Sequence, residues 1–140
     1  MIIAGLDLGQ MRIGVAISDT LLKTTQPITT IARRSLAQDL AALERELKPR
    51  GVEKIIVGLP LNMDGSEGAP ARRMRGFAAR LHDTLRIPVE LCDERLTTFE
   101  ARERLRGLPL ARSRRRAATD ALAAMLVLET WLATRPDLNA

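Results

Sequence analysis

Short apolar runs separated by turn residues open the chain. Met1–Leu8 is apolar on both strand faces, which is typical of a strand at the centre of a covered sheet. Gly9–Met11 can turn the chain, so we expect Arg12–Ser18 to form a second strand that pairs with the first as a hairpin. Pro27–Ile31 predicts a shorter third strand. The N-terminal part is therefore expected to be a meander of three antiparallel strands.

After the meander the pattern changes to alternating helices and strands. Ser35 stands three residues before Gln38, which is the spacing of a capping box and predicts the start of a helix. The apolar positions that follow fall on one helical stripe, made of Leu36, Leu40, Leu43 and Leu47. The elements expected next are a strand at Lys54–Leu59, a polar loop at Pro60–Gly68, a helix over about Ala71–Arg86, a strand at Pro88–Asp93, a short helix from Thr97 to about Arg106, a basic run at Arg112–Arg116 and a last helix at Ala117–Ala133.

This order of elements predicts an α/β fold. A meander that continues into alternating helix and strand indicates a five-stranded mixed sheet with helices on both faces. The chain has 140 residues and shows neither an internal repeat nor a linker. We therefore expect one domain over residues 1–140.

The amino-acid composition indicates which kind of partner the protein binds and in which cellular compartment it is expected. The net charge is +5, and nearly all the cationic residues are Arg, which binds phosphate in a bidentate way. This favours a polyanionic partner, although a merely solvated basic surface explains the charge equally well. The single cysteine, Cys92, allows no internal disulfide, and neither a signal peptide nor an apolar stretch long enough to cross a membrane is evident. We expect a cytoplasmic protein without a membrane partner.

Acidic residues stand where the pattern predicts burial or a cleft. Asp7 is the only charge in the first eleven residues and lies inside the strand expected at the centre of the sheet. An unpaired buried carboxylate is costly, so Asp7 is expected to bind a metal or border a cleft, unless it is only a turn residue before Gly9. Asp93 and Glu94 close the fifth strand, where open α/β sheets bind ligands. Because neighbours in a strand point to opposite faces, only one of these two can face Asp7.

Asp120 lies near the expected start of the alanine-rich last helix. The small residues around it would let the helix approach the sheet, so that Asp120 could reach the cleft that Asp7 borders. Taken alone, Asp120 is explained more simply as an acid favoured by the helix dipole. Together, the acids of the strand, the strand end and the helix form an oxygen ligand set that suits Mg²⁺ or Mn²⁺. Two such ions about 4 Å apart can drive phosphodiester hydrolysis.

Four segments resemble motifs of the YqgF/RuvX family, in order and over nearly the whole chain. They are DLGQMRIGVAISD (Asp7–Asp19), GLPLNMDGSEG (Gly58–Gly68), DERLTT (Asp93–Thr98) and DALAAMLVLETWL (Asp120–Leu132). Members of this family carry provisional descriptions as pre-16S rRNA nucleases or Holliday junction resolvases. The resemblance implies a ribonuclease H-like fold and a metal-dependent nuclease. The expected substrate is the 5′ end of pre-16S rRNA, as part of ribosome biogenesis, and the alternative is four-way DNA.

The resemblance also implies roles for the acids and for two motif residues. Asp7, Glu94 and Asp120 correspond to the catalytic metal ligands, and Asp93 is a supporting neighbour. Arg12 and Asn62 fall in family motifs and suit contacts either to phosphate or to local structure.

One departure from the family concerns the residue before the last-helix Asp, where similar proteins often carry Lys. Here Ala117–Thr119 precede Asp120, so a lysine-specific proton role is lost. The basic residues lie a turn further back, in an expected loop, and a phosphate contact can survive that shift. The residues expected to contact nucleic acid there are Arg112, Arg114, Arg115 and Arg116.

Two other functions stay open at this point. The first motif also looks like the phosphate-binding hairpin of actin-like ATPases and sugar kinases, but those proteins close two lobes around a nucleotide, which one 140-residue domain cannot supply. A non-catalytic nucleic-acid-binding protein would keep the basic surface without needing all the acids. The sequence does not choose between RNA and DNA, nor between a monomer and a homodimer, although a four-way junction would suit a two-fold dimer.

Overall fold

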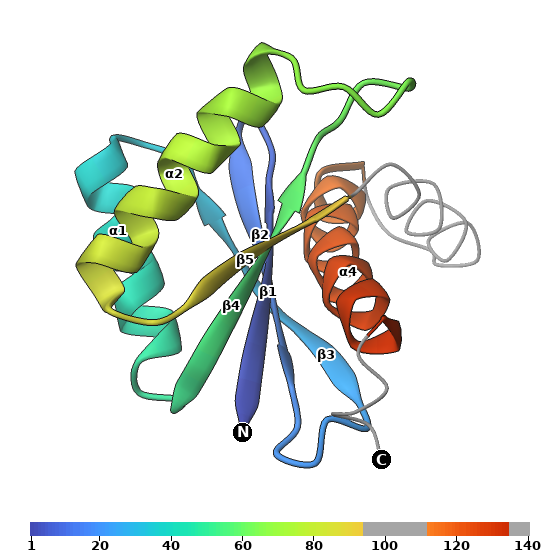
Figure 1. The fold of residues 1–140 in the computed structure, drawn as a ribbon. Helices are drawn as coiled ribbons and strands as arrows, with labels where there is room; N and C mark the ends of the chain where they lie inside the picture. Colours follow the sequence, from blue (N-terminus) through green and yellow to red (C-terminus); the bar gives the residue numbers. More distant parts are fainter. Residues whose placement is uncertain (94–111, 135–140) are drawn as a thin grey trace.

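The computed structural model describes residues 1–93 and 112–134, and the side chains of 1–93 and 120–134. The short helix expected between Thr97 and Arg106 lies outside these residues. Among the helices described, none is both long and apolar enough to span a lipid bilayer. The elements, drawn in Figure 1, are β1 (Ile2–Leu8), β2 (Arg12–Ser18), β3 (Thr25–Ala32), α1 (Leu36–Leu47), β4 (Val52–Leu59), α2 (Ala69–Leu85), β5 (Val89–Asp93) and α4 (Arg112–Ala133).

The five strands form one mixed sheet in the order β3–β2–β1–β4–β5. Strands β1, β2 and β3 pair antiparallel as a meander, and β4 and β5 continue the sheet parallel to β1. Helices α1 and α2 cover one face of the sheet, and α4 covers the other (Figure 1). The predicted α/β fold, with its mixed sheet and antiparallel meander, is therefore confirmed.

Alternating strand side chains separate two apolar layers. On the α1–α2 face, Leu6 of β1 belongs to a buried cluster with Leu43 and Leu81 of the helices. On the α4 face, Ile3 of β1 belongs to a second buried cluster with Leu128. Because successive strand residues point to opposite faces, the odd-numbered residues of β1 face α4.

The predicted elements differ from the observed ones mainly at their ends. Strand β3 is longer than the expected Pro27–Ile31, because it pairs with β2 from one end to the other. Ser35 and Gln38 form the predicted capping box at the start of α1. Leu36, expected on the buried stripe, is 39% exposed, because it is the first residue of the helix and precedes the turns that pack on the sheet.

Helix α4 begins earlier than expected. It starts at Arg112, so the basic run Arg112–Arg116 forms its first turns and is not a loop in front of it. Arg and Ala both have high helix propensity, which lets the run continue the helix. The earlier start puts Asp120 more than two turns inside α4. The helix dipole, which acts within the first turn, therefore does not explain this acid.

Two glycines let α4 lie very close to the sheet. A Cβ at Gly5 would stand 2.6 Å from the carbonyl oxygen of Ala124, and a Cβ at Gly14 would overlap the carbonyl of Asp120. Asp120 and Ala124 are about one turn apart, so consecutive turns of α4 rest on the two glycines. Any side chain at either position would push the helix away from the sheet.

We expect Gly14→Ala to lower the free energy of unfolding by about 1–3 kcal/mol or more, because the new methyl group meets backbone rather than a mobile side chain. Gly76→Ala is the matched control, because an added Cβ in this exposed part of α2 meets nothing within 4 Å. That change should raise stability by about 0.4–1 kcal/mol. Urea unfolding measures both, and equal effects would contradict the close approach of α4.

Candidate active site

Asp7 and Asp120 lie at the same corner of the sheet, which we call the carboxylate corner, although they come from distant parts of the chain. Asp7 of β1 pairs in register with Gly14 of β2, and Gly14 lies against the backbone of Asp120. Asp7 stands two residues after Gly5 and therefore shares its face, the one that α4 covers. Both acids are half-buried. The structure thus brings together two of the three acids expected to act in concert.

Arg12 pairs with one of these carboxylates. Its Nε atom donates a hydrogen bond of 2.9 Å to Oδ2 of Asp120. The two side chains are 29% and 24% exposed, so the pair is better shielded from water than an ordinary surface salt bridge. The other oxygen, Oδ1, lies 3.9 Å from the position that a Cβ of Gly9 would take. Arg12, expected to contact either phosphate or local structure, makes a structural contact here and orients Asp120.

Hydrogen bonds within the β1–β2 turn and from Arg33 hold the turn that precedes Arg12. The amide of Gly9 donates to the carbonyl of Arg12 at 2.8 Å, which closes the turn. The amide of Arg33 donates to the carbonyl of Met11 at 2.9 Å, and Arg33 Nη1 donates to the carbonyl of Gly9 at 2.9 Å. Arg33 therefore holds the turn at two points.

Asp39 holds Arg33 in turn. Its side chain is only 4% exposed, and its carboxylate accepts a hydrogen bond from the amide of Arg34 and lies 3.8 Å from Arg33 Nε. The sequence interpretation missed this support. A signal was present, because Asp39 stands three residues after Leu36 and four before Leu43, on the apolar stripe of α1. A charge on such a stripe indicates a buried polar contact.

The packing of β5 shows on which face of the sheet Asp93 lies. Leu91 packs against the cluster on the α1–α2 face, and Cys92 packs against the cluster on the α4 face. By strand alternation Asp93 shares the face of Leu91. Asp93 therefore lies on the opposite face from Asp7. Glu94, the other candidate, lies outside the described residues, so its contacts stay a prediction.

Asn62 orders the loop between β4 and α2. Its carbonyl accepts the amide of Gly65, its amide donates to the carbonyl of Ser66, and its Nδ2 donates to Ser66 Oγ at 3.0 Å. Asp64 accepts two further hydrogen bonds from Ser66. These contacts are local, which agrees with a structural role for Asn62, while a contact of Asn62 with nucleic acid stays a prediction.

Two of the three expected metal ligands, Asp7 and Asp120, lie in the part of the chain whose side chains are described. Within residues 1–93 and 120–134, no group of three His, Cys, Asp or Glu side chains is arranged to hold an ion. Asp7 and Asp120 supply two carboxylates at one corner, and the third expected ligand, Glu94, lies beyond this part. The basic run Arg112–Arg116 stands on the same helix as Asp120, eight to four positions before it.

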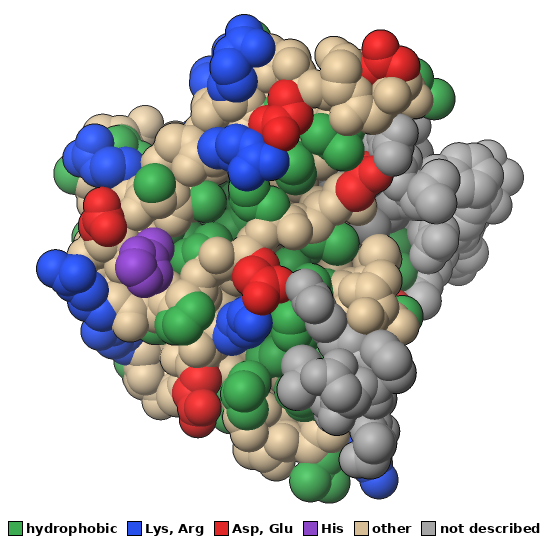
Figure 2. All heavy atoms as spheres, in the orientation of Figure 1, with side chains coloured by type: hydrophobic (Ala, Val, Ile, Leu, Met, Phe, Trp, Pro, Cys, Tyr) green, Lys and Arg blue, Asp and Glu red, His purple; other side chains and the backbone are tan. Residues whose placement is uncertain are grey.

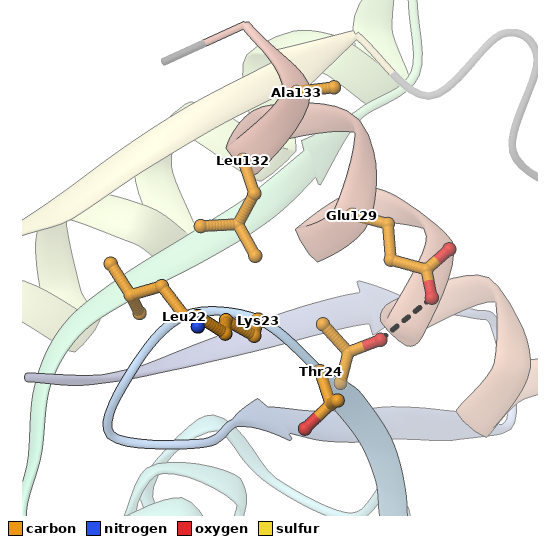
Figure 3. Close-up of a pocket in the computed structure, with 7 residues that line it drawn as sticks. Leu22, Lys23, Thr24, Glu129, Leu132 and Ala133 are labelled. Atoms are coloured by element: carbon orange, nitrogen blue, oxygen red, sulfur yellow. Dashed lines mark hydrogen bonds between the residues drawn. The ribbon is translucent and has the colours of Figure 1, made fainter. Parts of the chain in front are cut away.

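Other surfaces of the described part are less suited to this chemistry. On the face seen in Figure 2, the Lys and Arg side chains are scattered rather than gathered in one patch. A hollow of about 480 Å³ lies at the end of the sheet opposite the carboxylate corner, between the β2–β3 connection and the last turns of α4 (Figure 3). There Thr25 Oγ1 donates to Glu129 Oε1 at 2.7 Å, and Lys23 also lines the hollow. Among the described residues that line this hollow, Glu129 is the only acid.

Sequence comparisons link the chain to one family. The profile of RuvX, described as Holliday junction resolvase, matches residues 1–134. A protein of Anaeromyxobacter dehalogenans with the provisional name pre-16S rRNA nuclease is 50% identical over 131 residues, which are 94% of this chain and 96% of the relative. A protein of Myxococcus xanthus with the same provisional name is 50% identical over 133 residues, covering 94% of this chain and 88% of its own length.

Solved structures share the fold at low sequence identity. Thermus thermophilus RuvC in complex with a Holliday junction substrate superposes with a TM-score of 0.60 at 16% identity, covering 96% of this chain and 97% of RuvC. A ROK family protein from Streptococcus pneumoniae, in complex with sucrose, has a TM-score of 0.52 at 21% identity. That match covers 73% of this chain but only 37% of the ROK protein. The whole fold is therefore shared with RuvC, and only part of the ROK protein resembles it.

We expect Arg12 and Asp120 to be energetically coupled, because their hydrogen bond is partly shielded from water. In a double-mutant cycle with Arg12→Met and Asp120→Asn, the coupling should stabilise the fold by about 0.5–1 kcal/mol. The same cycle on Arg50 and Glu46, an i,i+4 pair at 2.9 Å on the surface, should give about 0.3–0.5 kcal/mol. Urea unfolding measures both cycles. A coupling near zero for Arg12 and Asp120 would show that Asp120 is not held by this contact.

Proposed function

Because the chain belongs to the RuvX family, we propose that it is a nuclease that hydrolyses phosphodiester bonds in structured nucleic acid. The observation that carries the proposal is the meeting of Asp7 and Asp120 at one corner of the sheet. Two half-buried carboxylates at one corner of the sheet repel each other unless a cation lies near them. Arg12 supplies a positive charge to one of them, and a metal ion would supply more.

We infer that Asp7, Glu94 and Asp120 hold Mg²⁺ or Mn²⁺. All their donors are carboxylate oxygens, which these hard ions prefer. Cys92 packs on the α4 face, and Glu94 stands two positions later in the sequence. A strand continued by one residue would put Glu94 on that same face, which supports Glu94 over Asp93. Divalent ions bound there would activate a water molecule for attack and stabilise the leaving oxygen.

The protein's own groups prepare this corner. Arg12 fixes Oδ2 of Asp120 and thereby limits rotation of the carboxylate. Gly14 lets the backbone of Asp120 touch β2, beside the strand position of Asp7. Ligands held in place by such contacts lose little freedom when an ion binds, which favours both affinity and a defined geometry.

We propose the 5′ end of pre-16S rRNA as the substrate, because relatives at 50% identity carry that provisional name. Four-way DNA is the second candidate, and it is favoured by the description of the family profile. The RuvC fold, seen in complex with such a junction, extends over almost this whole chain, which agrees with the same candidate. Both substrates are structured polyanions, so the basic composition favours either one.

Two of the proposed ligands, Asp7 and Glu94, are tested by substituting each one with its amide. Asp7→Asn and Glu94→Gln should each lower the cleavage rate by about 100-fold or more, because each removes a charged metal ligand. Asp93→Asn is the matched control for Glu94→Gln and should cost less than about tenfold, because Asp93 belongs to the opposite face of the sheet. Single-turnover cleavage is measured in Mg²⁺ or Mn²⁺ on a labelled pre-16S rRNA 5′ end and on a four-way junction, and calorimetry measures metal binding.

Two outcomes would contradict this assignment. A larger loss from Asp93→Asn than from Glu94→Gln would mean that the wrong face of β5 had been chosen. If the unmodified protein cut neither substrate in either metal, yet bound both, a non-catalytic nucleic-acid-binding protein would be the better description.

The arginines of α4 are tested through the salt dependence of binding. Replacing Arg114–Arg116 with Ser should weaken substrate binding and flatten the log–log salt slope by about 0.7–0.9 for each phosphate that the variant no longer neutralises. Metal binding should persist, because no ligand is removed. The matched control carries three exposed arginines of the α1–α2 side, Arg45, Arg50 and Arg80, replaced with Ser. Equal slopes in the two triple variants would show that the α4 arginines are only surface charge.

A further inference from the structure

A second hollow, of about 340 Å³, lies beside the carboxylate corner. Its lining comes from the β1–β2 turn, the β3–α1 connection, the start of the β4–α2 loop and helix α2. Much of this lining is apolar and includes Leu8, Met74 and Phe77, which belong to the core of the α1–α2 face or pack against it. The hollow therefore rests on the folded core rather than on loop residues alone.

Two arginines line this hollow, Arg33 and Arg73, and no acidic residue is among the described residues that line it. Arg73 is exposed and makes no hydrogen bond or ion pair with any described residue. Arg33 uses Nη1 for the carbonyl of Gly9, and its Nε atom lies 3.8 Å from Asp39. A guanidinium carries five N–H donors, so Arg33 can still donate to a ligand.

The apolar lining strengthens the field of these arginines. Charges beside low-dielectric walls attract a counter-ion more strongly than charges surrounded by water. Arginine also matches the geometry of phosphate oxygens better than lysine does. The hollow therefore suits an anion with several oxygens.

Gly9 joins the hollow to the carboxylate corner. It lines the hollow, and the position of its Cβ would lie 3.9 Å from Oδ1 of Asp120. The β1–β2 turn is thus the common wall of the two places. Consider a nucleic-acid strand that has one phosphate at the carboxylates of Asp7 and Asp120. If this strand crosses the β1–β2 turn, a neighbouring phosphate reaches Arg33 and Arg73.

We propose that Arg33 and Arg73 bind a backbone phosphate that neighbours the cleaved one. This inference rests on the proposed nuclease function, since it concerns the path of the same substrate. The two arginines hold the strand across the β1–β2 turn, and they add to the contacts expected from the arginines of α4. Arg33 has a double task, because it also braces the turn, whereas Arg73 acts on the ligand alone.

Arg73→Ser tests the site, and Arg80→Ser is its matched control. Both arginines are exposed on α2 and stand seven residues apart, on the same side of the helix two turns along, but only Arg73 lines the hollow. Both changes are made in an Asp7→Asn background, so that substrate stays intact in Mg²⁺. Fluorescence anisotropy measures binding of the labelled pre-16S rRNA 5′ end and of the four-way junction over a series of salt concentrations.

Arg73→Ser should weaken binding of the preferred substrate about tenfold and flatten the log–log salt slope by about 0.7–0.9, as expected when one phosphate is no longer neutralised. Arg80→Ser should change the dissociation constant by less than about twofold. If the two variants bind equally while the Asp7→Asn protein binds well, the arginine site is wrong and the proposed function stands. If the Asp7→Asn protein binds neither nucleic acid, both proposals are wrong.

Discussion

Helix α4 lies so close to the sheet that its carbonyl groups occupy the space where side chains of Gly5 and Gly14 would stand. Packing of this kind leaves no room for adjustment, because protein interiors are dense and backbone atoms cannot rotate out of the way. The position of α4 along the sheet is therefore set to within a fraction of a turn. Since Asp120 is the residue whose carbonyl meets Gly14, and Gly14 pairs with Asp7, the same contact decides which acids meet.

A second layer of support lies behind this corner. Arg33 holds the turn that precedes Arg12, and the buried carboxylate of Asp39 keeps Arg33 in place. A buried polar group is stable only when it has a hydrogen-bonding or charged partner. Asp39 has two such partners, the amide of Arg34 and the guanidinium of Arg33. The turn, the helix contact and the carboxylates thus form one continuous set of contacts.

Local patterns in the sequence were sufficient for most of the fold. Three features depend only on residues close to them in the sequence and could be interpreted without the structure. They are the capping box of Ser35 and Gln38, the apolar run of β1 and the isolated charge of Asp7. The pairing of Arg12 with Asp120 and the brace from Arg33 could not be predicted, because they depend on how distant elements pack. The start of α4 was misplaced because the predicted boundary followed the apolar positions, which begin after the arginines, and not the helix propensity of Arg.

The hydrogen bond between Arg12 and Asp120 joins residues 108 positions apart. The carboxylate corner therefore depends on the order in which the chain is synthesised and folds. Contacts between such distant residues form late, because the loop between them has to close first. Because the chain is synthesised from its N-terminus, β1 to β5 leave the ribosome before α4. A nascent chain that has made its whole sheet still has only one side of the carboxylate corner. Asp120 therefore reaches the corner of Asp7 only after α4 has been synthesised and has docked, so a partly made molecule lacks one of the two acids.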